Sequence, residues 1–435
     1  MVTKNLNSFK ITTTKQAITS FAGLPLLLGM AKNLGLEEQI NALPLKERAR
    51  GYKPAESAFA LMGLIQSGGE ALDDVSLLKG DEGLCELWGR LPASNTLGEW
   101  LRRFNRKTVH QLGRIQLAAA AKVLRVCKLV RVTLDVDAFF LESQKSGVEM
   151  NYEGLWGYNP MAVTCAELKM PMAGIFRDGS ASPMANIAAM LKRTIEALPG
   201  IAVRVRSDSA GFQAKVVRVL RNKNADFTIT MRKDENVLGS IYGIPETKWK
   251  SYETGAWKNR KCEIAEDLHV FVEANDLPAY RMIVIRWPKE EPGLFDKTPY
   301  EYHAVLTSLD GWTAGLVLQF HRTRQDGSEN VNKELSGGFG LSKLPCREFM
   351  ANAAYFQIAL LAYTVSAAFK HLALPESWKH LTIKTLRFRI IRLAGIVSRR
   401  ARSLWMKVSG KYPFREVYEN ARYRLLWLSA TMSTA

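Results

Sequence analysis

The chain has 435 residues, of which 47% are hydrophobic, enough to build one large or two to three ordinary domains. Its formal net charge of +18 favours a polyanionic partner, most commonly nucleic acid. The five cysteines are odd in number and none forms a Cys-x-x-Cys pair. This pattern argues against a disulfide framework or a structural zinc site and fits a reducing cytoplasm.

Two segments bear on export and on membranes. Residues 1–16 lack the apolar core of a signal peptide. The most apolar stretch, residues 353–369, is interrupted by Gln357 and is shorter than the roughly 20 residues of a membrane span. We therefore expect a buried helix at this position and no membrane partner.

The first 125 residues have the pattern of an all-helical domain. Apolar residues recur at helical spacing over residues 55–67, and Gly68 follows as a helix end. Residues 110–125 are rich in strong helix formers. We expect residues 1–125 to form a helical DNA-binding domain.

Residues 126–375 change in character, because short β-branched segments alternate with helical ones. Strands are predicted at residues 129–141, 157–176, 201–207, 226–233 and 300–309, and helices at residues 180–198, 212–223 and 332–369. An irregular, mostly strand-like stretch at about residues 240–300 interrupts this alternation. The pattern indicates an α/β core with a β-rich insertion.

The last region, residues 376–435, is basic. Between Lys379 and Arg424 there are 13 lysines and arginines and two glutamates, so the net charge there is +11. Basic and apolar residues interleave at roughly helical spacing, so that one helix face would pack on the core while the other binds phosphates. A membrane-surface helix or a solvated helix face has a similar pattern. We favour DNA, with Arg387, Arg399 and Arg400 as candidate contacts.

Two acids lie two positions apart in the first predicted strand of the core. Asp135 and Asp137 point to one face of that strand, whereas Val132, Leu134 and Val136 point to the other. A bound cation would relieve the repulsion between the two carboxylates, and Mg²⁺ prefers carboxylate oxygens. A solvent-exposed edge strand is the alternative interpretation.

Two further acids lie in separate segments. Asp208 follows a predicted strand, where α/β sheets build sites, although it also suits the cap of the next helix. Glu329 lies between Arg324 and Lys333 at a helix start, where a solvated ion pair is the simpler interpretation. Acids from three segments of a strongly basic α/β protein would together hold two metal ions on DNA, which suits in-line phosphoryl transfer.

Motifs along nearly the whole chain resemble one family. They are GGEALDDVSLLKGDEGLCELWGRLPASNTLGEWLRRF in the N-terminal region, and then VTLDVD, NYEGLWGYNPM, RSDSAGF, SENVNKELSGGFG and ANAAYFQIALLAY. In this order and spacing the motifs resemble the DDE transposases of bacterial insertion sequences. Within them the sequence is most similar to the subgroup with a Tyr-Arg-Glu-Lys signature and to the insertion sequence 1380 group.

The resemblance implies a ribonuclease-H-like α/β catalytic core with a β-rich insertion before the glutamate. By motif, the first catalytic acid falls on Asp137 or Asp135, the second on Asp208 and the third on Glu329, with Glu334 as a rival. It also implies two Mg²⁺ ions, for which Mn²⁺ would substitute. The ligands would be Asp137, Asp208 and Glu329.

The sequence departs from the family signature at its tyrosine and basic positions. His321 stands where the signature has Tyr, and Arg324 precedes Glu329 by five residues instead of four. Ser336 stands where the signature has Lys, and the nearest basic residue is Lys333. These departures affect the expected roles of the Arg and Lys more than those of the acids.

The resemblance further implies cleavage of double-stranded DNA at terminal inverted repeats and strand transfer into target DNA. We expect a homodimer on DNA, in the bacterial cytoplasm at the nucleoid. Candidate DNA contacts are Arg324 and Lys333.

In related transposases a tryptophan of the insertion stabilises a flipped base, which makes Trp249, Trp257 and Trp287 candidates, with a core position as the alternative for each. Two other functions stay open. One is a ribonuclease-H-like nuclease that cuts without joining, and the other is a non-catalytic DNA-binding protein derived from a transposase.

Overall fold

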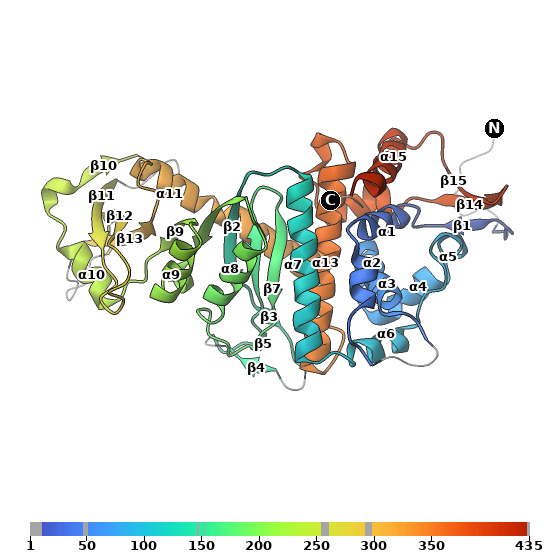
Figure 1. Cartoon of the computed structure of the whole chain (residues 1–435), viewed down its shortest axis with the longest axis horizontal. Coiled ribbons are helices and arrows are strands. Elements are labelled where there is room, and N and C mark those ends of the chain that lie inside the picture. The colour runs from blue at the N-terminus through green and yellow to red at the C-terminus, as the bar shows by residue number, and fades with distance from the viewer. Residues whose placement is uncertain are drawn as a thin grey trace.

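The computed structural model describes residues 11–46, 51–145, 148–151, 153–253, 261–291 and 298–432. Trp257, a candidate base-stacking residue, lies outside them. Figure 1 shows an elongated molecule with a large β-sheet towards one end and the N- and C-terminal helices towards the other. Two long helices, α7 (Arg106–Val126) and α13 (Phe349–Ala373), lie side by side between these parts.

The N-terminal region is helical, as predicted, apart from the short strand β1 (Ala17–Thr19). The helix predicted at residues 55–67 is α3 (Pro54–Ser67), which begins with a proline in its first turn. It ends at Gly68, whose φ of 91° is a left-handed conformation that glycine adopts readily. The other elements before α7 include α1 (Leu24–Asn33), α2 (Leu36–Asn41), η1 (Leu72–Asp74), α4 (Val75–Lys79), α5 (Glu82–Trp88) and α6 (Ser94–Leu101).

A nine-stranded sheet in the order β10-β11-β12-β13-β9-β8-β2-β6-β7 forms the centre of the other part. Five of its strands are β2 (Arg131–Ala138), β6 (Met161–Cys165), β7 (Met170–Ile175), β8 (Ala202–Ser207) and β9 (Asp226–Thr230). Strands β2, β8 and β9 are parallel, whereas β6 and β7 run antiparallel to their neighbours. Helices α8 (Ile187–Glu196) and α9 (Ala214–Asn222) connect β7 to β8 and β8 to β9. The predicted mixed α/β fold is therefore confirmed.

The β-rich segment predicted at about residues 240–300 continues this same sheet. After α10 (Glu235–Tyr242) and η3 (Glu246–Lys248) come β10 (Lys250–Tyr252), β11 (Cys262–His269), β12 (Tyr280–Pro288) and β13 (Tyr300–Thr307). All four are antiparallel, and β13 pairs with β9. A small apolar cluster that includes Ile283, Ile285 and Trp287 packs them against α11 (Ala314–Arg322).

A second, small sheet follows β2 directly in the chain. Its strands lie in the order β3-β5-β4, with β3 at Leu141–Glu142, β4 at Glu149–Met150 and β5 at Trp156–Tyr158.

Helix α13 is part of the core, which confirms the expected buried helix. In the part of the chain that the structure describes, it is long and apolar enough to cross a membrane by composition, but 89% of its most apolar window is buried inside the protein. The helical stretch predicted at residues 332–369 is broken, because α12 (Asn330–Gly338) ends before α13 begins at Phe349. Gly340, with a φ of 75°, lies in the turn between them.

The prediction of a continuous helical region at the C-terminus is wrong in its middle. Strands β14 (Gly395–Arg400) and β15 (Ser403–Val408) form a hairpin that pairs with β1. The two turn residues, Ala401 and Arg402, both have a positive φ, which matches the twist of a tight hairpin and ends any helix. Helical segments flank the hairpin: η5 (Glu376–Trp378), α14 (Ile383–Leu386) and η6 (Arg387–Ile391) before it, and α15 (Arg415–Met432) after it.

Candidate active site

The parallel pairing of β2 with β8 brings two of the predicted acids together. Asp135 lies opposite Arg206, and Val136 lies opposite Ser207. Asp137 and Asp208 are the next residues along each strand, so both lie at the carboxyl end of the pair. Functional groups of α/β sheets gather at this end of the strands.

The Asp137 carboxylate is only 18% exposed and is contacted by a segment distant in the sequence. Its Oδ2 accepts hydrogen bonds from Ser328 Oγ at 3.3 Å and from Asn332 Nδ2 at 3.2 Å. Arg324 Nη1 lies 3.9 Å from Oδ1. The segment that carries Glu329 therefore folds over the end of β2.

The pKa of Asp137 is raised from its ordinary value of 3.8 to about 6. Burial is the largest cause, and the negative charges of Asp208 and Glu329 act in the same direction, against the positive charge of Arg324. The strand pairing and the hydrogen bonds of Asp137 thus bring acids from three separate segments of the chain to one end of the sheet.

Asp208 and Glu329 also have the local partners that the simpler interpretations predicted. Asp208 caps the short 3-10 segment η2 (Ser209–Gly211), since its Oδ1 accepts a hydrogen bond from the amide of Ala210 at 3.0 Å. Glu329 is half exposed and forms an ion pair with Lys333 at 3.6 Å. Glu329 is thus exposed to a ligand, and Asp208 is a half-buried residue.

Asp135 is unsuited to the role of first acid, because its carboxylate is buried and fully engaged. Its side chain has 0% exposure, and Arg206 binds both oxygens, with Nε 2.6 Å from Oδ1 and Nη2 2.8 Å from Oδ2. Such a bidentate pair compensates two charges that would otherwise be costly to bury. The two acids of β2 therefore differ, and Asp137 is the better candidate for chemistry.

The buried pair also supports the segment that carries Glu329. Arg206 Nη1 donates to the Phe320 carbonyl at 2.8 Å and to Thr323 Oγ1 at 2.5 Å. The next turn is a π-helix, η4 (Gln325–Glu329), a form that is frequent at functional sites. A Cβ added at Gly327 would lie 2.9 Å from Asp135 Oδ2, so this turn packs directly on the buried pair.

Glu334, the rival third acid, has a structural role. Tyr363 Oη donates to its Oε2 at 2.8 Å, and the amide of Ile383 donates to its Oε1 at 2.5 Å. Both oxygens thus tie α12 to α13 and to the start of α14. Glu329 is accordingly preferred as the third acid.

No group of three or more His, Cys, Asp or Glu side chains in the described ranges is arranged to hold a metal ion as the side chains stand. The acids nevertheless fit divalent cations in their chemistry. Their oxygens are the ligands that Mg²⁺ prefers, and a cation would offset both the burial of the Asp137 carboxylate, which is the main cause of its raised pKa, and the smaller repulsion from Asp208 and Glu329.

Arg387, a predicted DNA contact, is instead a structural residue. Its guanidinium donates to the carbonyl oxygens of Gln66 at 2.9 Å and Ile65 at 2.6 Å, and also to that of Gly338. Burial lowers its pKa to about 10. Arg387 therefore satisfies carbonyl groups at the ends of α3 and α12, which would otherwise lack partners.

Three of the other four predicted basic contacts, Lys333, Arg399 and Arg400, are exposed, whereas Arg324 is mostly buried. Arg399 and Arg400 are exposed on β14, and Arg399 forms an ion pair with Glu86 at 3.4 Å. Lys333 and Arg324 lie beside acids of the candidate site. These four residues remain predicted DNA contacts.

Two of the three candidate tryptophans take part in packing. Trp287 is 7% exposed, and its indole donates to Glu301 Oε2 at 2.8 Å, so a base-stacking role is wrong for it. Trp249 is half buried, and the Arg286 guanidinium covers one ring face at 4.1 Å from the centroid. The core alternative therefore describes both better.

Sequence reasoning missed three residues of the site. Arg206 lies on β8 two positions before Asp208, and this spacing on one strand was its only signal. Ser328 and Asn332 flank Glu329 within one helical turn. Their hydrogen bonds to Asp137 depend on tertiary contact, which the sequence does not reveal.

Comparison with known proteins adds the following findings. No curated protein matches this chain. Seven chains of solved structures match. One of them, from a cryo-EM structure of the piggyBac transposase synaptic complex with hairpin DNA, is 11% identical, with a TM-score of 0.49, and the match covers 97% of this chain and 87% of that one. The profile of the family "Transposase DDE domain group 1" matches residues 3–430. The chain therefore belongs to this family of DDE transposases.

Proposed function

We propose that the protein is an insertion-sequence transposase that cuts DNA at the ends of its element and joins those ends to target DNA. Asp137, Asp208 and Glu329 are its catalytic acids. The observation that carries this proposal is that Ser328 and Asn332, on either side of Glu329, donate hydrogen bonds to Asp137, while the parallel pairing of β2 with β8 brings Asp208 to the same end of the sheet. These contacts bring carboxylates from three segments together in a chain of net charge +18 that belongs to a transposase family.

We propose that β7-β6-β2-β8-β9, together with α8 and α9, is a ribonuclease-H-like core and that β10 to β13 belong to an insertion. The parallel strands β2, β8 and β9 beside the antiparallel strands β6 and β7 support this assignment. A place in the insertion sequence 1380 group, a bacterial cytoplasmic location at the nucleoid and a homodimer on DNA are further parts of the proposal. They rest on the motif resemblance.

Asp137, Asp208 and Glu329 would hold two divalent cations, Mg²⁺ or Mn²⁺. When bound, such ions supply activation of the attacking water or 3′-hydroxyl and stabilisation of the leaving 3′-oxygen. The approach of the positively charged ions would favour the ionised form of Asp137, whose pKa lies near 6 without them.

The surrounding residues orient the acids. Ser328 and Asn332 donate to Oδ2 of Asp137, which fixes the carboxylate and leaves Oδ1 without a hydrogen bond from either. Lys333 holds Glu329 at the surface through an exposed ion pair, which is weak enough to exchange for a metal ion.

A cleavage assay tests the proposal. The substrate is a labelled duplex with the element's own end, and the proteins are the wild type, Asp137→Asn, Asp208→Asn and Glu329→Gln, each with Mg²⁺ and with EDTA. Glu196→Gln is a matched control, because Glu196 is also a surface acid in an ion pair with a lysine.

We expect cleavage by the wild type and by the control only with metal, and loss of cleavage in the three variants while duplex binding remains. Cleavage by all three variants at the wild-type rate would overturn the assignment of the acids. Binding without cleavage by the wild type would favour the non-catalytic DNA-binding alternative.

A further inference from the structure

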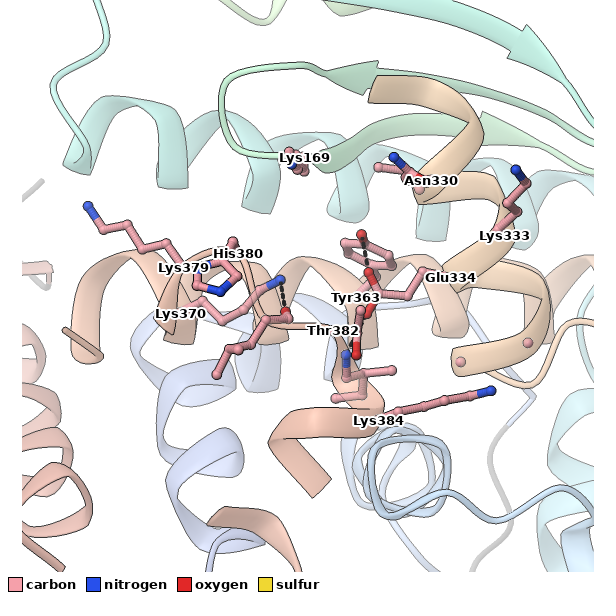
Figure 2. A pocket seen from close by; sticks show the side chains of 15 residues that line it. Lys169, Asn330, Lys333, Glu334, Tyr363, Lys370, Lys379, His380, Thr382 and Lys384 are labelled. Carbon is pink, nitrogen blue, oxygen red and sulfur yellow. Dashed lines mark hydrogen bonds between the residues drawn. The ribbon is translucent and has the colours of Figure 1, made fainter. Parts of the chain in front are cut away.

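A lysine-rich pocket of about 390 Å³ opens beside the candidate active site. Figure 2 shows that its lining comes from α12, from α13, from the segment around α14 and from the turn between β6 and β7 that carries Lys169. None of the three candidate catalytic acids, Asp137, Asp208 and Glu329, lines this pocket.

The lining is strongly positive. Five lysines face one acid, Glu334, and both oxygens of that acid accept hydrogen bonds from the protein. The lysines are Lys169, Lys333, Lys370, Lys379 and Lys384. The lining therefore carries more positive than negative charge.

Three of the lysines have partners. Lys370 is buried and donates to the Leu381 carbonyl at 2.9 Å, Lys379 forms an ion pair with Glu376, and Lys333 forms one with Glu329.

The other two, Lys169 and Lys384, are exposed, and neither forms an ion pair with any residue that the structure describes. Figure 2 shows them on opposite sides of the pocket. They are the lysines best placed to bind an anion from outside.

The pocket adjoins one of the three acids, Glu329, at its Lys333 end. Asn330, Lys333 and Glu334 line it, and they follow Glu329 on the same helical segment. The ion pair of Lys333 with Glu329 spans the boundary between the acidic cluster and the lysines. A nucleic acid strand that passes Glu329 could therefore continue over the Lys333 end of the pocket.

We propose that this pocket binds backbone phosphates of the DNA strand to one side of the bond that is cut, past Glu329, with Lys169 and Lys384 as the contacting residues. This inference rests on the proposed function. A lysine ammonium is a compact charge that suits phosphate without demanding a particular base. The contact would position the DNA on the acids and would not read its sequence.

The first test is the salt dependence of binding to the element-end duplex, measured in EDTA so that no cleavage occurs. Each phosphate contact contributes about 0.9 to the slope of log K against log salt, so Lys169→Ala/Lys384→Ala should lower that slope by about 1.8. The matched control is Lys107→Ala/Lys215→Ala, which removes the same charge from two exposed lysines on α7 and α9.

The second test locates the contact by replacing single phosphates of the duplex with neutral methylphosphonates. The wild type and the control should lose affinity when one or two phosphates near the cut bond are neutralised, whereas the pocket variant should be insensitive at those positions. Equal sensitivity of wild type and pocket variant at every position would overturn the inference.

A third measurement separates DNA from free phosphate. If inorganic phosphate raises the melting temperature of the wild type but not of the pocket variant, while the duplex results do not differ, the pocket binds a small anion and the DNA assignment is wrong. Failure here is distinguishable from failure of the proposed function. In the first case the wild type still cuts with metal, and in the second it does not cut at all.

Discussion

Replacing Asp137 with Asn is expected to stabilise the metal-free protein at neutral pH. The pKa of Asp137 is about 6 in the folded protein, against an ordinary value of 3.8, so the folded state binds this proton more tightly than the unfolded chain does. The stability that the group contributes is full below about pH 4 and is lost as the pH rises through about 6. At about 1.36 kcal/mol per pKa unit, ionised Asp137 costs the fold about 3 kcal/mol at pH 8, a cost that Asn avoids.

Urea denaturation in EDTA at about pH 4 and about pH 8 measures this effect. We expect the variant to exceed the wild type by about 3 kcal/mol at the higher pH and to match it closely at the lower pH. Asp135→Asn is the contrasting variant, because it leaves Arg206 buried without a counter-charge and should destabilise the protein by about 3–5 kcal/mol at the higher pH. If Asp137→Asn destabilised the protein at both pH values, the raised pKa of Asp137 would be refuted.

Three further outcomes follow from the same contacts. Arg387→Ala should lower the free energy of unfolding by about 3 kcal/mol, because it leaves buried carbonyl oxygens without donors. The slope of log K for DNA binding against log salt should stay unchanged. A lower slope with normal stability would instead identify Arg387 as a DNA contact. Trp287→Ala should cost about 3–5 kcal/mol in urea denaturation, and weakened DNA binding at full stability would instead indicate base stacking. Mg²⁺ at a hundred times its dissociation constant should stabilise the wild type by about 2.7 kcal/mol in thermal unfolding. Equal stabilisation of Asp208→Asn would place the metal elsewhere.

The strands of the core and the meeting of two acids were predictable from the sequence. Alternating β-branched residues marked β2 and β8, and acids near the carboxyl ends of two parallel strands meet whenever those strands are neighbours. The third acid depended on family motifs, because no local pattern brings Glu329 to the end of β2.

Tertiary partners separate residues that the sequence pattern leaves equivalent. Asp135 and Asp137 are equivalent in the strand pattern, and only the bidentate contact from Arg206 separates them. In the sequence, Arg387 does not differ from the other basic residues of its amphipathic segment. Its structural role depends on carbonyl groups at the ends of α3 and α12, which only the folded structure brings to it.

The prediction of helix where the C-terminal hairpin lies was wrong for a different reason. Interleaved basic and apolar residues fit both a helical and a strand period over a few residues, so the pattern alone did not discriminate. The turn residues Ala401 and Arg402 adopt a left-handed conformation, but neither is a glycine or asparagine, the residues that usually mark such a turn in a sequence. The pairing of the hairpin with β1 joins segments that are far apart in the sequence, so no local pattern shows it.

Strand transfer tests the central claim most directly. Pre-cut element ends with a free 3′-hydroxyl would be incubated with target plasmid and Mg²⁺, and joined products would be scored for the wild type, Glu329→Gln and the Glu196→Gln control. We predict joined products from the wild type and from the control and none from Glu329→Gln. Joining by Glu329→Gln at the wild-type rate would contradict the assignment of the acids. Absence of joined products from a wild type that cuts the intact element end would identify a nuclease instead of a transposase.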